Sequence, residues 1–184
     1  MSKVAVVVAS LVALGCAPQT IIESRRAPDM TEKLTELFVI SGAGSDGELK
    51  APEFEKALTE TGRTCGLRIG VSSLSKLELD TSVHEERMKT FGGHHLLTVE
   101  LTRATTVQND FDVVMYDARL YQMEPKKMLW RADMRMKVGG TSIGSAGETL
   151  ALDMLRQMHS DGLVKWCEML VQPEKPVRHR ADGN

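Results

Sequence analysis

The sequence predicts an α/β fold of the α+β type, a two-layer sandwich in which helices cover one face of a mainly antiparallel sheet. Three segments in the second half of the chain alternate apolar with polar residues, which is typical of strands with one packed and one wetted face. Apolar residues at helical spacing occur before and after these segments. The elements therefore follow in the order β-α-β-(α)-β-β-β-α, and such a sheet buries its apolar face under helices.

The first half of the predicted domain places a helix between two strands and adds a short second helix. Pro52 stands where the first turn of a helix accepts proline, and Gly66 follows the predicted end of that helix at Thr64. The next segment alternates apolar and polar residues as a strand does. We expect strands at residues 34–41 and 67–74, and helices at 52–64 and 82–90.

Three strands and a final helix are predicted for the second half. The inward-facing residues of the last strand include Met128, Trp130, Met134 and Met136, so these methionines are interpreted as core residues rather than as a copper site. The helix is expected to begin near Glu148, after a Gly-rich stretch. We expect the strands at 95–103, 111–121 and 128–138.

Asp117 and Asp133 are candidate acid–base residues on the wetted face of neighbouring strands, because paired carboxylates can serve as acid and base. In one register of the hairpin formed by these two strands, residues whose numbers sum to 252 lie opposite each other. In that register Arg119 faces Asp133 and Asp117 faces Arg135. Exposed ion pairs of this kind help to set strand register. We therefore expect both carboxylates to have a structural role.

Composition excludes some classes of partner. The chain has 184 residues, which is enough for one domain with its own core. Its formal net charge is −2 and only 4% of its residues are aromatic, so it lacks both the basic field and the stacking surface that nucleic-acid binding needs. No nucleic-acid partner is expected.

The first sixteen residues have the layout of an export signal. Met1–Lys3 is short and positive, Val4–Gly15 is uncharged and too short to span a bilayer, and Cys16 follows. The segment resembles a bacterial lipoprotein signal, in which VALG at 12–15 stands at the lipobox, although the favoured order of leucine and small residue is reversed. The alternative is a buried first strand, since VAVVV is rich in β-branched residues.

The lipoprotein resemblance implies cleavage before Cys16, diacylglycerol on its sulfur and an acyl chain on its new amine. Ala17 follows the cysteine in place of aspartate, which in such families favours the outer membrane. The expected organisation is a signal peptide at 1–15, a lipidated cysteine and tether at 16–33, an α/β domain at 34–171 and a flexible tail at 172–184. The membrane is then a partner through the lipid on Cys16.

The domain shows a second resemblance. FGGHHLLTVEL, FDVVMYDARLYQ and KKMLWRADMRMK, followed by a helix that ends in SDGLV, look like small bacterial envelope lipoproteins. These include relatives of the curli-secretion lipoprotein and the N-terminal domain of the Tol-system propeller protein. The resemblance implies a non-enzymatic, periplasm-facing adaptor or assembly factor of an envelope complex, with a protein partner. Only Cys16 is carried over as a functional residue.

Cys65 and Cys167 remain after Cys16 is assigned. In an oxidising compartment they can form a disulfide, or they can be two separately buried thiols, and the sequence leaves both possibilities open. Neither has a CxxC neighbour, so a zinc site is not indicated.

The other candidate motifs are each expected to be structural. GAGSDG at 42–47 matches GxGxxG but does not lead directly into a helix, and the Gly-rich loop at 139–147 lacks a lysine at P-loop spacing. His84 has no second histidine at HExxH spacing, and the adjacent His94 and His95 point to opposite faces. No cofactor, metal or catalytic residue is expected. The alternative is a periplasmic small-ligand binder or hydrolase that uses the Gly-rich loops.

Overall fold

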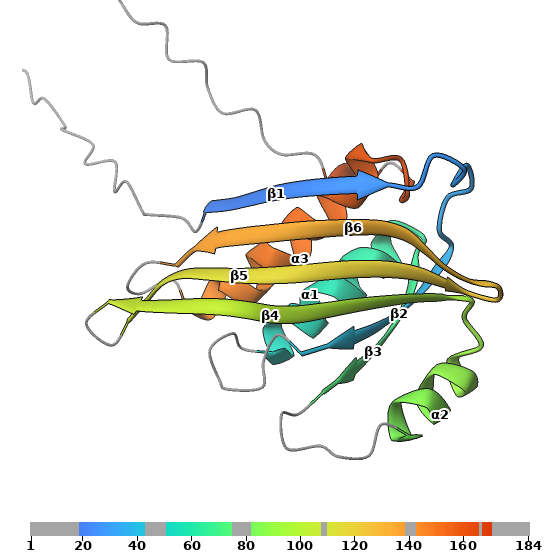
Figure 1. Ribbon diagram of the computed structural model, residues 1–184, viewed down its shortest axis with the longest axis horizontal. Coiled ribbons are helices and arrows are strands. Elements are labelled where there is room, and N and C mark those ends of the chain that lie inside the picture. The colour runs from blue at the N-terminus through green and yellow to red at the C-terminus, as the bar shows by residue number, and fades with distance from the viewer. Residues whose placement is uncertain are drawn as a thin grey trace, which may run out of the picture.

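The computed structural model describes residues 19–42, 51–74, 82–107, 110–138, 143–165 and 167–170. Within them, six strands form one sheet in the order β1-β6-β5-β4-β2-β3, with α1 and α3 side by side against one face (Figure 1). The strands are β1 (Gln19–Arg26), β2 (Glu36–Ser41), β3 (Arg68–Ser73), β4 (His95–Val107), β5 (Asp110–Met123) and β6 (Lys126–Lys137). The helices are α1 (Ala51–Thr64), α2 (Ser82–Phe91) and α3 (Ile143–Ser160), followed by the 3-10 helix η2 (Glu168–Leu170).

The predicted fold class is confirmed, and the sheet is mixed. β1, β6, β5 and β4 pair antiparallel, whereas β4, β2 and β3 pair parallel. The connection lengths explain the difference, because β5 and β6 are joined by a tight turn, while β2 and β3 are joined through α1, as a parallel crossover requires.

The core lies between the sheet and the pair α1 and α3. Met134 and Met136 are buried there as predicted, together with Trp130 from the same strand. Phe54 and Leu58 close the layer from α1 and are fully buried. Burial of each such side chain contributes roughly 1.5–3 kcal/mol, so this layer stabilises the whole domain.

α3 begins five residues before the predicted start. Glycines at its N-terminal end favour a loop in the sequence, yet the helix includes them from Ile143 onward. Ala146 is fully buried. Packing of this small residue in the core outweighs the low helix propensity of its glycine neighbours.

β1 was not predicted, and the tether expected at residues 16–33 is wrong over Gln19–Arg26. These eight residues pair antiparallel with β6, from Gln19 opposite Lys137 to Arg26 opposite Trp130. The alternation of apolar and polar residues is weak here, because Thr20 and Ser24 face α3 while the apolar Ile21 is 63% exposed on the other face. Ile22 packs against the core from this strand, and polar contacts of Ser24 and Arg26 add to its attachment.

The predicted register of the β5–β6 hairpin is wrong by two residues. Asp117 lies opposite Asp133, and Arg119 lies opposite Arg131. Each strand still buries the predicted face, because a two-residue shift leaves the faces unchanged. Between Met128 and Trp130 an irregularity in β6 changes which side chains face the core. Met128, which was expected in the core, is therefore 45% exposed.

α2 covers the opposite face of the sheet at its β2–β3 end. Leu37 and Val39 of β2 belong to the core under α1 and α3, so Phe38 between them faces the other way. The ring centroid of Phe38 lies 5.6 Å from that of Phe91 in α2. Gly70 of β3 is required beside them, because a Cβ there would lie 2.7 Å from the Phe91 ring.

Candidate functional site

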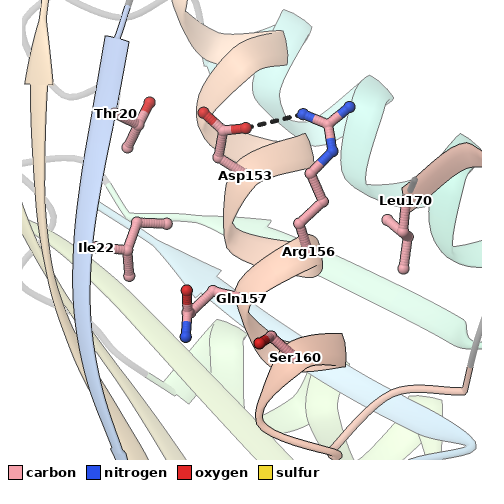
Figure 2. A pocket seen from close by; sticks show the side chains of 7 residues that line it. All are labelled: Thr20, Ile22, Asp153, Arg156, Gln157, Ser160 and Leu170. Carbon is pink, nitrogen blue, oxygen red and sulfur yellow. Dashed lines mark hydrogen bonds and ion pairs between the residues drawn. The ribbon is translucent and has the colours of Figure 1, made fainter. Parts of the chain in front are cut away.

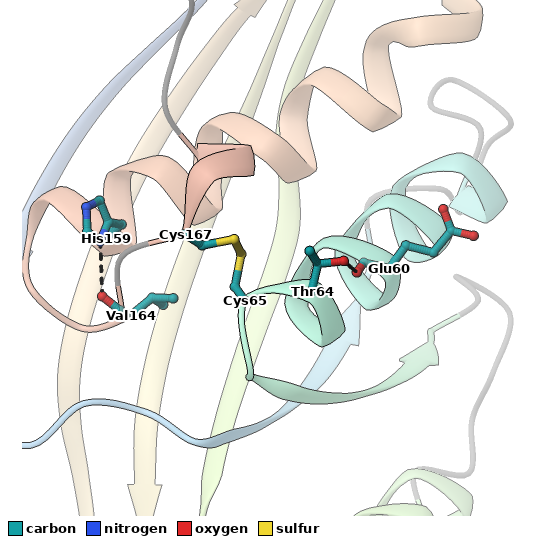
Figure 3. Close-up of a disulfide and its surroundings, with 6 residues drawn as sticks. All are labelled: Glu60, Thr64, Cys65, His159, Val164 and Cys167. Carbon is teal, nitrogen blue, oxygen red and sulfur yellow. Dashed lines mark hydrogen bonds between the residues drawn. A yellow bond between two sulfur atoms is a disulfide. The ribbon is translucent and has the colours of Figure 1, made fainter.

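A disulfide joins Cys65 to Cys167, with the two Cα atoms 5.1 Å apart (Figure 3). Cys65 lies in the turn that ends α1, and Cys167 lies just before η2. Of the two possibilities that the sequence leaves open, the structure has the paired one. The bond spans 102 residues and ties the end of the first helix to the segment after the last.

Asp117 is the most enclosed acidic residue of the open sheet face, by which we mean the face away from α1 and α3. Its side chain is only 5% exposed. Arg119 donates from Nε to its Oδ2 over 3.0 Å, and Arg131 donates from Nε to its Oδ1 over 3.2 Å. The hydrogen bond to Asp117 raises the pKa of Arg119. Asp117 is thus paired with two arginines, neither of them the predicted Arg135.

Asp133 is a separate, solvated carboxylate, 69% exposed and 3.4 Å from Nη2 of Arg131. The structure brings the two candidate acid–base residues onto opposite positions of one hairpin. Because Asp117 is occupied by two guanidinium groups, the pair lacks a free buried acid of the kind that general acid catalysis uses. The arrangement is suited to fixing strands.

The three candidate histidines lie in different environments. His94 is exposed, and its backbone N–H donates to Oε1 of Glu36. His95 is partly buried, and this burial lowers its pKa. His84 is buried at 3% exposure, and its Nδ1 lies 2.8 Å from Oγ of Ser72. Packing of α2 against β3 buries it, and the described residues contain no group of three or more metal-ligating side chains.

A hollow of about 270 Å³ lies between β1, α3 and η2 (Figure 2). Arg156 on α3 donates from Nη1 to Oδ1 of Asp153 over 2.8 Å, which neutralises the charge within the hollow. The sequence does not predict this hollow, because β1, which forms one of its walls, was not predicted. Its lining residues are Thr20, Ile22, Asp153, Arg156, Gln157, Ser160 and Leu170.

Asp161, just after α3, fastens that helix to the sheet. Its Oδ2 accepts hydrogen bonds of 2.6 Å from Oγ of Ser24 in β1 and from Nε1 of Trp130 in β6. Its Oδ1 accepts one of 3.1 Å from Gln157, and its backbone oxygen accepts one of 2.7 Å from Arg26. One carboxylate therefore satisfies the buried indole N–H and holds β1 in place.

Substitution Asp161→Ala is expected to lower the free energy of unfolding by about 2 kcal/mol, because it leaves the Trp130 N–H buried without an acceptor. Urea unfolding of the purified protein measures the change. Asp133→Ala is the matched control on a 69% exposed carboxylate, and its effect should stay within about 0.5 kcal/mol. Equal effects of the two substitutions would contradict the role given to Asp161.

Several predicted sites lie outside the described residues. These are Cys16 with the signal segment, the glycines after Gly42 in the GxGxxG motif, and the tail at 172–184. The Gly-rich loop at 139–147 is described only from Ile143, where it forms the first turns of α3. Among the described residues, none of the helices is long and apolar enough to cross a membrane.

Comparison with known proteins shows similarity in structure alone. No protein-family model matches the chain, and no curated protein matches it either. A PelC dodecamer from Paraburkholderia phytofirmans is 13% identical, with a TM-score of 0.51 over 80% of this chain and 100% of that chain. A PelC variant dodecamer from the same organism is 14% identical, with a TM-score of 0.48 over 73% and 96% of the two chains. The first comparison shows a shared fold.

Proposed function

We propose that this chain is a non-enzymatic lipoprotein, anchored through Cys16 on the periplasmic face of the outer membrane, that acts as an oligomeric adaptor or assembly factor of a cell-envelope complex. The observation that carries the proposal is the fold, which matches the PelC chain along that chain's whole length. That protein was solved as a dodecamer, which supports an oligomeric role. The lipobox-like segment before Cys16 supports the anchor.

The position of β1 adds a constraint on how such an anchor would hold the domain. β1 begins at Gln19, three residues after Cys16. Three residues of extended chain reach at most about 11 Å. A lipid on Cys16 would therefore keep the adjacent end of the sheet, where Gln19 pairs with Lys137, close to the membrane surface. The adaptor is held against the membrane rather than on a long tether.

The contacts of the buried carboxylates support a structural rather than a catalytic role for them. Asp117 is held by two arginines, and Asp161 bridges three elements of the fold. Both carboxylates fix strands or helices in place. An adaptor depends on such fixed surfaces, and its activity does not require proton transfer.

Complementation of a deletion strain tests the non-enzymatic role. Asp117→Asn, Asp133→Asn and His95→Gln are each expected to retain cellular function at equal protein levels, because none of these groups transfers a proton. Asp117→Asn should also lower the free energy of unfolding by about 1–3 kcal/mol, since it weakens two charge-assisted hydrogen bonds in a buried site. A folded, lipidated Asp117→Asn protein without function would contradict the proposal and favour an enzyme.

An affinity pull-down of the lipidated protein from detergent-extracted membranes tests the adaptor role. The expected result is a complex that contains several copies of the chain and at least one other envelope protein. Recovery of the chain as a monomer without partners would contradict the proposal.

A further inference from the structure

Charges on the open sheet face are arranged in bands that run across the strands. Cross-strand pairing places four acidic residues side by side, which we call the acidic band. Next to it lies a basic band that contains Arg135 and Arg103, with Met115 between them. The step from the acidic to the basic band is two residues along β5 and β6, and three along β4, where the register shifts between Leu101 and Arg103. The acidic band consists of Glu23, Asp133, Asp117 and Glu100, from β1, β6, β5 and β4 in turn.

This arrangement is unfavourable within one molecule. Like charges directly opposite each other on neighbouring strands are destabilising, whereas opposite charges would stabilise the same sheet. Arg119 and Arg131 on the other side of the acidic band compensate mainly Asp117. Within the described residues, Glu100, Arg103 and Arg135 have no ion-pair partner.

We infer that the open sheet face is a docking surface for a second copy of this chain. The two bands lie about 7 Å apart, which is two residues along a strand. A two-fold axis that runs between the bands and parallel to them places each acidic band over the basic band of the other copy. Glu100 then faces the partner's Arg103, and Asp133 faces the partner's Arg135. Each contact forms twice, as in any isologous interface.

Charge complementarity favours a second copy over a polyanion or a polycation. Either polymer would meet a band of its own sign next to a band of opposite sign. A rotated copy instead forms the opposite-charge contacts of Glu100 and of Asp133 twice each, against one like-charge contact, Arg131 over the partner's Lys137, which also forms twice. Ile21, which is 63% exposed, lies opposite Arg135 at the end of the basic band and adds apolar surface. In the rotated copy Ile21 lies over the partner's Glu23, so the contacts of Glu100 and Asp133 with arginines carry the specificity.

The dimensions of the face predict a weak contact that depends on salt. Four strands about 4.8 Å apart and eight residues long offer roughly 500 Å² in each copy, so the pair reaches only the lower limit for a specific interface. Screening by salt weakens contacts between charges of this kind. The inference concerns the domain surface and does not depend on acylation of Cys16.

The docking surface is tested by reversing the charges of either band in two double variants and then mixing the two variants. Sedimentation equilibrium of the full chain in density-matched detergent measures association of the wild type, of Glu100→Arg/Asp133→Arg and of Arg103→Glu/Arg135→Glu. Each double variant should associate about tenfold or more weakly than the wild type, because like bands then face each other. An equimolar mixture of the two variants should regain the association, since the four contact positions 100, 103, 133 and 135 are then all basic in one variant and all acidic in the other.

The control is Glu86→Arg, an exposed charge reversal on α2, which should leave the association unchanged. Raising the salt from about 0.05 to 0.5 M should weaken association of the wild type. Circular dichroism establishes that each variant is folded. A monomeric wild type, double variants that associate like the wild type, or a mixture that fails to regain association would each overturn the inference.

Discussion

Replacing Cys65 and Cys167 together by alanine is expected to lower the free energy of unfolding by about 3–5 kcal/mol. The disulfide joins residues that are 102 positions apart and encloses every element from β3 to α3. In the chain-entropy model, a loop of this length restricts the unfolded chain by up to about 4.7 kcal/mol. The effect is large because a domain of this size has only about 5–15 kcal/mol of net stability.

Urea unfolding of the oxidised wild type and of the double variant measures this change. The single variants Cys65→Ala and Cys167→Ala are the matched controls. Because either substitution removes the same bond, each single variant should be destabilised about as much as the double variant, so the effects are not additive. A double variant within about 1 kcal/mol of the wild type, or a wild type with two alkylatable thiols, would contradict the prediction.

Substitution Cys16→Ser is expected to move the protein out of the membrane fraction and to abolish its cellular function. Each buried methylene of an acyl chain contributes about 0.8 kcal/mol, so several chains give stable anchoring that the unlipidated domain lacks. Membrane fractionation with a high-salt wash, combined with complementation at equal protein levels, measures both effects.

Cys167→Ala is the matched control, since it removes a different cysteine and should leave the protein in the membrane fraction. A Cys16→Ser protein that stays with the membranes after the wash and still complements the deletion would count against the anchor. A released protein that still complements would keep the anchor but contradict the need for a membrane-bound adaptor.

Periodicity was sufficient to predict the strands and helices whose buried side is apolar. It failed at β1, where the side that faces α3 has Ile22 between the polar Thr20 and Ser24, and where Asp161, a carboxylate on a distant turn, accepts a hydrogen bond from Ser24. An edge strand with a single apolar residue between polar ones on its buried side shows no hydrophobic alternation. The groups that β1 contacts, β6 and Asp161, are distant in sequence and come together only in the folded chain.

The arrangement of charges on the open face was predicted in kind but not in detail. Asp117 and Asp133 lie on the expected face with arginines beside them, yet the hairpin register differs by two residues. Hydrophobic patterning cannot distinguish registers that differ by two, because the same side chains stay buried. The burial of His84 was missed for a related reason, since it depends on where α2 packs against β3.

The most direct test of the central proposal is the mass of the N-terminal peptide from protein extracted from membranes. The account predicts a chain that begins at Cys16 and carries both the diacylglycerol and the amide-linked acyl chain. A chain that begins at Met1 or at another residue, or one with an unmodified Cys16, would contradict it.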